Sequence, residues 1–293
     1  MMRPVFWITV AAAMTAGNLQ AVWGQSVHAT ALTPLVFQSH QTNAQQPQFT
    51  NEDLVTKGLF PFIMFMDNQQ EGYTAARGRL ANLYMILLKD LDNQTLLRLA
   101  LRAMPTFLIP PEREISDLKF NYKTKEETIA VDLRPQRDRI TLDGEVFHKK
   151  RGLVRTIDER HLFLAVGIET ILELPQEKLK QLKIKENPEY HVLAHELGHA
   201  IYLGGLTNEQ RADVNHCWQN VKPSSRLISI EKEEILKLEY FANYMSLWFG
   251  TFPGGYPDYR LTMTNNLCMS SFFRKLFRKN GPYKPDYISK QLP

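Results

Sequence analysis

The sequence predicts an α+β protein, in which helices, a small sheet and further long helices follow one another along the chain. Residues 72–103 carry apolar side chains three and four positions apart, which is the spacing of one helix face. Between about residues 117 and 174 the pattern changes to short runs of β-branched and aromatic residues, which favour strands. Helical spacing returns after residue 187. A chain of 293 residues is long enough to bury a core in this arrangement.

The N-terminus is typical of an export signal. The segment "MMRPVFWITVAAAMTAG" has one positive charge, Arg3, followed by an apolar run that is too short to span a bilayer comfortably. Cleavage is expected after Gly24, with Ala29 as a second choice, so residues 1–24 are the predicted signal peptide. An uncleaved anchor or a buried N-terminal helix is the alternative. We therefore expect an exported protein, either periplasmic or secreted.

The chain after this segment is expected to form one domain. Residues 25–50 are rich in Gln, Asn and Thr and contain no Lys, Arg, Asp or Glu, which predicts a flexible lead-in. Residues 51–293 are predicted to form a single α+β domain, with a helical part at 51–116 and the sheet and long helices at 117–293. The formal net charge of +4 is too small to indicate a nucleic-acid partner.

Two helices are predicted before the sheet. The segment "ARGRLANLYMILLKDL" (76–91) leads into "DNQTLLRLALRAM" (92–104), where Asp92 or Asn93 is expected to cap the second helix. Pro105 and a later Pro-Pro pair end the helical pattern. The strands are predicted from five runs: "LKFNY" (118–122), "TIAVDL" (128–133), "RITL" (139–142), "GLVRTI" (152–157) and "HLFLAVGI" (161–168).

The segment "HVLAHELGHA" (191–200) predicts a largely buried helix that ends at Gly204–Gly205. His195 and His199 are four residues apart, so their imidazoles lie within about 40° of each other and about 6 Å apart along the axis. They can therefore bind one ion. Glu196 lies one position further round, within reach of a water molecule beside that ion. This HExxH order is typical of two zinc ligands and a general base, although an exposed polar helix face is the alternative.

A catalytic zinc ion usually takes a third protein ligand. The best candidate is Glu239, in the predicted helix "SIEKEEILKLEYFANYMSLWFG" (229–250). Its neighbours one turn away are mostly apolar or small, and a carboxylate among them is costly unless it is paired or binds a metal. Asn243 lies one turn later and is expected to orient a ligand as an outer hydrogen-bond partner.

Alternatives stay open for the third ligand. Glu239 would otherwise form a buried salt bridge with Arg211 or Arg226. Asp213 and His216 are rival third ligands, since "RADVNHCWQ" offers both types of donor.

The remaining histidine of the segment, His191, shares a face with His195. It lies about 12 Å along the helix axis from His199, so one ion cannot bind all three side chains. We expect His191 to pack or to lie at the surface, or to hydrogen-bond a group beside the site.

These residues resemble the zinc-dependent metallopeptidases of the gluzincin type, in which a glutamate on a following helix joins the histidines of HExxH. The segment "LEYFANYMSLW" is similar to the E-x-F-A segment of the anthrax lethal factor-like and pro-pro endopeptidase group, and Glu239 follows His199 by 40 residues (239 − 199). The resemblance covers residues 188–250. It implies a zincin-like domain, with a small mixed sheet packed on the HExxH helix and a helical segment before it. It also implies Zn²⁺ bound by His195, His199 and Glu239, with Glu196 as the general base.

One position departs from that group. Its members have a transition-state tyrosine about two helical turns before the glutamate ligand, where this chain has Lys232. The residue that stabilises the oxyanion is therefore unassigned. The candidates are Tyr240, Tyr244, Tyr256, His216 and Lys232.

The predicted function is an exported zinc metallopeptidase, an endopeptidase that acts on a peptide or protein substrate. The substrate is expected to add a strand to the sheet, with residues 161–168 as the candidate edge strand; an ordinary core strand is the alternative for this segment. Two alternatives are an exported, non-catalytic zinc-binding protein with a partner-binding role, and a zinc hydrolase with a different kind of substrate.

Two features lie outside this site. Cys217 and Cys268 predict one disulfide in an exported protein, with two free buried thiols as the alternative. The segment "SSFFRKLFRKNG" (270–281) predicts a helix with an aromatic face and basic flanks. It is expected to pack on the domain, with contact to a membrane surface as the alternative.

Overall fold

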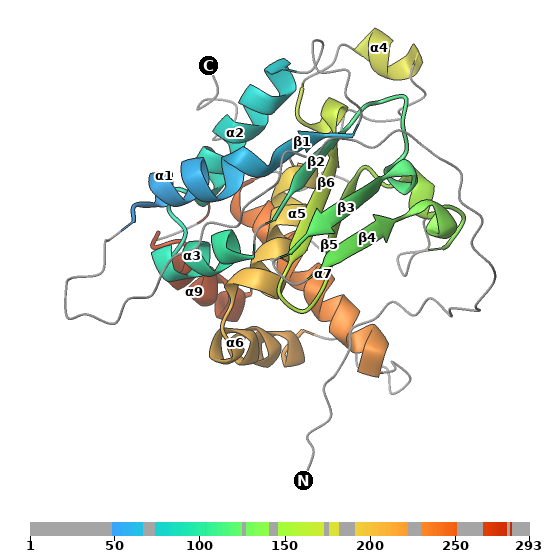
Figure 1. Cartoon of the computed structure of the whole chain (residues 1–293). Helices are drawn as coiled ribbons and strands as arrows, with labels where there is room; N and C mark the ends of the chain where they lie inside the picture. Colours follow the sequence, from blue (N-terminus) through green and yellow to red (C-terminus); the bar gives the residue numbers. More distant parts are fainter. Residues whose placement is uncertain are drawn as a thin grey trace.

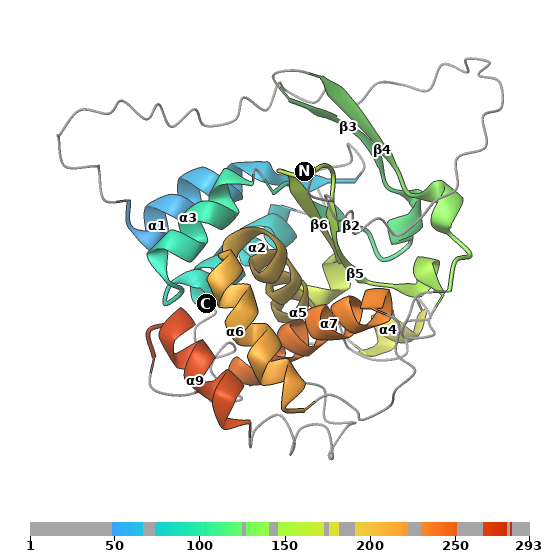
Figure 2. The same ribbon diagram turned by 90° about the horizontal axis from the view of Figure 1, so that it is seen from below.

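The computed structural model describes residues 49–66, 74–102, 104–124, 127–140, 146–172, 176–181, 191–221, 230–250, 266–279 and 282. They form a mixed α+β structure in which a small sheet has helices on one side and a β-hairpin on the other (Figure 1, Figure 2). The predicted α+β class is therefore confirmed. The predicted signal peptide and almost all of the predicted lead-in lie outside the described residues.

The central sheet has four strands in the order β1–β2–β6–β5. The first three are parallel, and β5 is antiparallel to β6. A separate antiparallel hairpin is formed by β3 and β4. The bounds are β1 Ile63–Phe65, β2 Thr106–Ile109, β3 Lys119–Lys123, β4 Thr128–Asp132, β5 Gly152–Thr156 and β6 Leu162–Gly167.

The prediction that residues 161–168 form an edge strand is wrong. β6 pairs with β2 on one side and with β5 on the other, and all of its residues are buried. A strand that is covered on both faces needs an unbroken apolar run such as "LFLAVG", not alternation. Among the described strands, β5 is the edge strand at this end of the sheet.

The part predicted to be helical, residues 51–116, contains two strands of the central sheet, β1 and β2. Both are short apolar runs, and such a run has no periodicity that separates a strand from a buried helix. Of the predicted strand at 139–142, only residues 139 and 140 are described, and Ile140 forms an isolated bridge with Val146. The helical segments of this part are α1 Asn51–Asp53, η1 Leu54–Leu59, η2 Phe60–Phe62, α2 Thr74–Leu88, α3 Asn93–Leu101 and η4 Ile115–Asp117.

The two faces of the central sheet support two hydrophobic clusters. Leu108 and Leu164 belong to the larger cluster, which contains the buried residues of α2, α3, α5 and α7. Phe107 and Phe163 point to the other side, where their rings lie 4.5 and 5.3 Å from the ring of Phe120 in β3. Because strand side chains alternate between faces, one pair of buried strands joins the helices to the hairpin.

The long helices of the second half end at the predicted glycines. The HExxH helix, α5, continues into a π-helical turn that ends at Gly205, and Gly250 follows α7 with a φ angle of 68°. This is the left-handed conformation that favours glycine after a helix. The bounds are η5 Arg134–Gln136, η6 Phe147–Lys149, η7 Ile168–Thr170, α4 Gln176–Gln181, α5 His191–Ala200, η8 Ile201–Gly205, α6 Asn208–Gln219, α7 Ile230–Trp248 and α9 Leu267–Leu276.

A disulfide joins α6 to α9, as predicted, through Cys217 and Cys268. On α9, Phe272 and Phe273 are buried in the larger cluster, whereas the basic Arg274 is exposed. The aromatic face of this segment therefore packs on the domain, as expected. In the described part of the chain, no helix combines the length and the apolar character that crossing a membrane requires.

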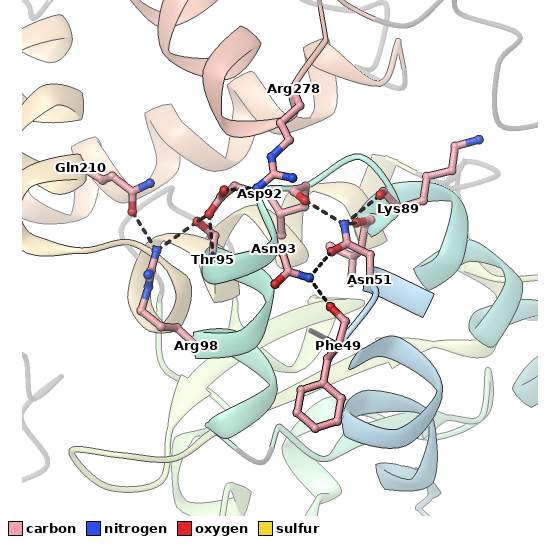
Figure 3. A network of polar contacts seen from close by, with 11 residues as sticks. Phe49, Asn51, Lys89, Asp92, Asn93, Thr95, Arg98, Gln210 and Arg278 are labelled. Carbon is pink, nitrogen blue, oxygen red and sulfur yellow. Dashed lines mark hydrogen bonds and ion pairs between the residues drawn. The ribbon is translucent and has the colours of Figure 1, made fainter. Parts of the chain in front are cut away.

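A polar network joins the first described residues to α2, α3, α6 and α9 (Figure 3). The Asn51 side chain donates hydrogen bonds to three backbone carbonyl groups at the end of α2, and Asn93 donates to the Phe49 carbonyl oxygen at 2.8 Å. Asp92 caps α3 and forms an ion pair with Arg278. We call this set the α3 network; it comprises Phe49, Asn51, Lys89, Asp92, Asn93, Thr95, Arg98, Gln210 and Arg278.

Candidate metal centre

α5 presents two histidines to one point. Leu193, Ala194 and Leu197 have no exposed surface, so one side of the helix is fixed in the core. His195 and His199 project from another side, with their Nε2 atoms 3.0 Å apart and their rings perpendicular. The four-residue spacing therefore brings the two imidazoles together, as predicted.

Glu239 of α7 completes a group of three. Its carboxylate oxygens lie 3.3 Å from Nε2 of His195 and 3.6 Å from Nε2 of His199. The side chains of the two histidines are 22% and 10% exposed, whereas that of Glu239 is 43% exposed. Within the described residues, these are the three side chains that can jointly hold a metal ion, and the group is open to solvent on the Glu239 side.

A close helix crossing makes this geometry possible. A Cβ atom on Gly198 would lie 2.7 Å from the Cα atom of Ala242 and 3.0 Å from the Cβ atom of Met245. The distance to the Ala242 backbone is shorter than real Cβ atoms show, and the distance to Met245 is tight, so a larger residue at position 198 would push α5 and α7 apart. Glu239 lies one turn before Ala242, and the crossing therefore brings its carboxylate to the histidines.

Glu196 lies beside the group without belonging to it. It is buried, and it accepts a hydrogen bond from the backbone N–H of Val154 in β5. Burial raises the pKa of Glu196 to about 7. The positive charge of His195 opposes this rise, whereas the negative charge of Glu239 adds to it. A Cβ atom on Gly152 would lie 2.5 Å from Oε1 of Glu196, so the edge strand directly limits where this carboxylate can lie.

The charges of the three grouped residues are coupled. Burial and the neighbouring His195 lower the pKa of His199 to about 3, so His199 is neutral near pH 7. Burial works against the ionisation of Glu239, but a hydrogen bond with His195 and the charges of both histidines outweigh it and lower its pKa to about 2. Burial opposes the protonation of His195, but a hydrogen bond with Glu239 and the charges of Glu196 and Glu239 outweigh it and raise the pKa of His195. The neutral His199 and the ionised Glu239 are in the protonation states that bind a metal ion, whereas a metal ion at His195 competes with a proton.

The described structure does not support Arg211 as a partner of Glu239, or Asp213 or His216 as the third ligand. The Arg211 guanidinium donates hydrogen bonds to the backbone oxygens of Tyr202 and Leu206, not to Glu239. Asp213 and His216 lie exposed on α6, outside the group. Arg226 lies outside the described residues.

Two of the tyrosines considered for the oxyanion, Tyr240 and Tyr244, are buried in the core. The Tyr240 hydroxyl accepts a hydrogen bond from the Asn266 side chain, and its ring packs on Trp218. Tyr244 is buried against Phe273. His216 lies exposed on α6, away from the ligand group. Tyr256 and the side chain of Lys232 lie outside what the structure describes.

Two further residues, His191 and Asn243, were predicted to lie beside the ligands. The His191 side chain lies outside the described residues, although its backbone begins α5. Asn243 lies one turn after Glu239 and is half-buried, but Nδ1 of His199 is buried and forms no hydrogen bond within the described part of the chain. The proposed orienting role of Asn243 therefore stays a prediction.

One residue close to the site was missed at the sequence level. Lys150 immediately precedes Arg151 and the edge strand. Its positive charge acts to lower the pKa of His195, Glu196, His199 and Glu239, although the pKa values of His195 and Glu196 are raised overall. The sequence signal was the basic run "HKKR" before a strand, which by itself is typical of an exposed turn. Only the packing of β5 against α5 brings this lysine near the histidines.

Comparison of the chain with protein-family models, with curated proteins and with solved structures finds no match. The function of the chain is therefore inferred from the geometry and chemistry of the site.

Proposed function

We propose that this protein is an exported, zinc-dependent metallopeptidase with a zincin-like domain, and that it hydrolyses bonds within peptide or protein substrates. One observation carries the proposal. His195, His199 and Glu239 each direct a ligand atom at a common point, with all of these atoms within 4.8 Å of one another, and Glu196 lies beside them.

The spacing of the ligand atoms suits zinc. Tetrahedral zinc, with bonds of about 2.0–2.2 Å, has ligand atoms about 3.3–3.6 Å apart. The Nε2 atoms of His195 and His199 are 3.0 Å apart, one oxygen of Glu239 lies 3.3 Å from Nε2 of His195, and its other oxygen lies 3.6 Å from Nε2 of His199. Two imidazoles and one carboxylate form a typical catalytic zinc set, in which the fourth position belongs to water or substrate. The exposure of Glu239 supports such an open position.

In this proposal Glu196 is the general base. When bound, zinc would supply a Lewis acid that polarises a substrate carbonyl and makes water more acidic. Glu196 accepts a proton from the attacking water as the water oxygen bonds to the carbonyl carbon. It then passes that proton to the leaving nitrogen as the carbon–nitrogen bond breaks. Its position beside the ligand group supports this role.

The substrate would lie along β5. Val154 faces Leu164 of β6, and Leu164 donates its backbone N–H to Pro105 on the far side. Antiparallel pairing therefore turns the backbone groups of Val154 towards the free edge. An extended peptide that pairs with this edge would bring its carbonyl groups close to Glu196.

Export is also part of the proposal. The Cys217–Cys268 disulfide supports an oxidising compartment, in which such bonds persist. N-terminal sequencing of the protein recovered outside the cytoplasm is expected to begin at Gln25 or, after the second possible cleavage, at Thr30. A mature protein that begins at Met1 would contradict export by this route.

The test of catalysis is the Glu196→Gln variant of the full chain. Both wild type and variant are expected to contain about one equivalent of zinc by elemental analysis, because Glu196 is not a ligand. Digestion of a peptide library should fall by at least about 10²–10⁴-fold in the variant, the usual contribution of a general base. Glu177→Gln, on the exposed surface of α4, is the matched control and should cleave like wild type.

Two results would contradict this proposal. If Glu196→Gln cleaves as fast as wild type, the proposed proton transfer is wrong. If the wild type binds zinc but cleaves nothing across a broad library, the non-catalytic zinc-binding alternative is favoured.

A further inference from the structure

Arg155 is a half-buried arginine of the edge strand β5, one residue after Val154. Within the part of the chain that the structure describes, its guanidinium forms no ion pair and no hydrogen bond. A charged side chain that is partly withdrawn from water is usually paired. This positive charge is therefore open to an anion from outside the chain.

The strand register places Arg155 on one face of the sheet. β5 and β6 pair residue for residue over five positions without a bulge, and Arg155 lies opposite Phe163. Directly opposed residues share a face. Phe163 belongs to the smaller hydrophobic cluster, where its ring lies 5.3 Å from that of Phe120 in the hairpin, and Leu153 packs against the same cluster. Arg155 therefore stands on the hairpin face of β5, away from α5 (Figure 2).

The alternate residues of β5 stand on the opposite face. A Cβ atom on Gly152 would lie 2.5 Å from Oε1 of Glu196, and Val154 packs against the larger cluster, which includes α5. The metal centre and Arg155 therefore lie on opposite faces of one short strand. Because side chains alternate in an extended peptide, a substrate paired with β5 would direct one side chain to the metal centre and the next to the Arg155 face.

A second arginine adds positive charge to the hairpin face. The backbone oxygen of Arg139 accepts from the N–H of Phe147 at 2.8 Å, and Phe147 is buried in the same cluster as Phe163. Arg139 is exposed, and its side chain has no ion pair among the described residues. Burial and the charge of Arg139 lower the pKa of Arg155, but a guanidinium stays charged near neutral pH.

Carboxylates of the neighbouring segments do not neutralise these two arginines, because they contact other side chains. The contacts are Asp132 with Arg134, Glu114 with Arg137, Asp158 with His161, and Glu169 with Arg151. Two positive charges without a described counterion favour an anionic ligand on this face.

We propose that Arg155 is a specificity-determining residue that binds a carboxylate side chain of the substrate, and that the preferred substrates are therefore acidic peptides. A guanidinium can donate two parallel hydrogen bonds to one carboxylate. Neighbouring strands lie about 4.8 Å apart, which the long arginine side chain can span. The inference rests on the proposed function, since it needs a peptide that pairs with β5.

The test begins with a library peptide that the wild-type full chain cleaves. Glu, Gln or Lys is placed in turn at each position around the cleaved bond. One position, or two positions on the same face of the peptide, should favour Glu over Gln by about 5-fold in kcat/KM. The residues directly beside it should show no such preference, because they face α5. High salt should weaken the preference for Glu.

Variants then assign the preference to Arg155. In Arg155→Gln the ratio of kcat/KM for the Glu and Gln peptides should fall to about 1, and in Arg155→Glu the Lys peptide should become the best substrate. Arg139→Gln should weaken the preference for Glu by a smaller factor. Arg274→Gln, which removes an exposed arginine from α9, is the matched control and should keep the wild-type preference.

The inference is overturned if the wild type cleaves the Glu, Gln and Lys peptides equally, if its preference for Glu does not change with salt, or if Arg155→Glu keeps that preference. The first two measurements need no variant, so they decide the matter even if the Arg155 variants do not fold. In each case a cleaving wild type and an inactive Glu196→Gln variant would leave the proposed function intact. A wild type that cleaves nothing would overturn both.

Discussion

The metal centre and the α3 network are both built from polar side chains on packed helices, but their side chains are directed differently. In the α3 network donors meet acceptors: the side chain of Asn51 donates to backbone carbonyl groups, and Asp92 accepts from Thr95 and from Arg278. At the metal centre, two ring nitrogens and a carboxylate converge on one point.

A histidine outside the metal centre illustrates the same difference. Nδ1 of His161 lies 2.7 Å from the carboxylate of Asp158, and this contact closes the turn between β5 and β6. The two Nε2 atoms of His195 and His199 face each other instead. Matched donors and acceptors stabilise a fold, whereas converging acceptors require a cation. The comparison predicts that substitutions in the two regions have different consequences.

The largest effect is expected for Glu239→Leu. Loss of an outer hydrogen-bond partner costs about 10–100-fold in metal affinity, so loss of a ligand should cost more than about 100-fold. Without metal, the free energy of unfolding should stay equal or rise, because a half-buried carboxylate is replaced by an apolar side chain. Calorimetric zinc titration and urea unfolding with a chelator measure the two quantities.

His216→Ala is the control for Glu239→Leu, because it removes an exposed histidine on α6 that the sequence alone left as a rival ligand. Its zinc affinity should match wild type. Loss of zinc in His216→Ala, or its retention in Glu239→Leu, would place the third ligand elsewhere.

An intermediate effect is expected for Asn51→Ala in the α3 network. The Asn51 amide donates to the carbonyl oxygens of Leu88, Lys89 and Leu91, and its removal leaves them without this donor. Leaving such groups unsatisfied lowers the free energy of unfolding by about 1–3 kcal/mol. Each kcal/mol lowers Tm by a few degrees. Zinc affinity should not change, since the network is separate from the ligands.

The control here is Asn82→Ala, which removes an exposed asparagine from α2 and should change stability by no more than about 0.5 kcal/mol. Equal free energies of unfolding for the Asn51 and Asn82 variants would show that the hydrogen bonds of Asn51 in the α3 network do not stabilise the fold.

The smallest effect is expected for Arg278→Ala. The Arg278 side chain is 61% exposed, so its ion pair with Asp92 is worth at most about 1 kcal/mol. Burial opposes ionisation of Asp92, but hydrogen bonds from Arg278 and Thr95 outweigh it and lower its pKa below the ordinary 3.8. The ion pair therefore stabilises the fold above about pH 4 and is lost as the pH falls through the lowered pKa.

Urea unfolding of wild type and Arg278→Ala at pH 7 and near pH 2.5 measures this difference. The difference in unfolding free energy between wild type and Arg278→Ala should shrink at the lower pH and in high salt, because both conditions weaken the ion pair. A gap that widens in acid would contradict the assigned role of Asp92.

Local patterns in the sequence determined much of the site. Helix periodicity alone brings His195 and His199 to one face with Glu196 beside them, and Glu239 was conspicuous as a carboxylate among apolar neighbours. The capping residue Asp92, the glycines that end α5 and α7 and the Cys217–Cys268 bond were likewise predictable, because each depends on near neighbours or on the small number of cysteines.

The tertiary structure decided which strands pair and which residues they bring to the histidines. β6 became an interior strand because β2, which the sequence did not distinguish from a helical region, pairs with its other edge. The same pairing makes β5 the edge and brings Gly152 against Glu196, where an added Cβ atom would lie 2.5 Å from Oε1. Strand order depends on contacts between distant segments, and local periodicity carries no information about those contacts.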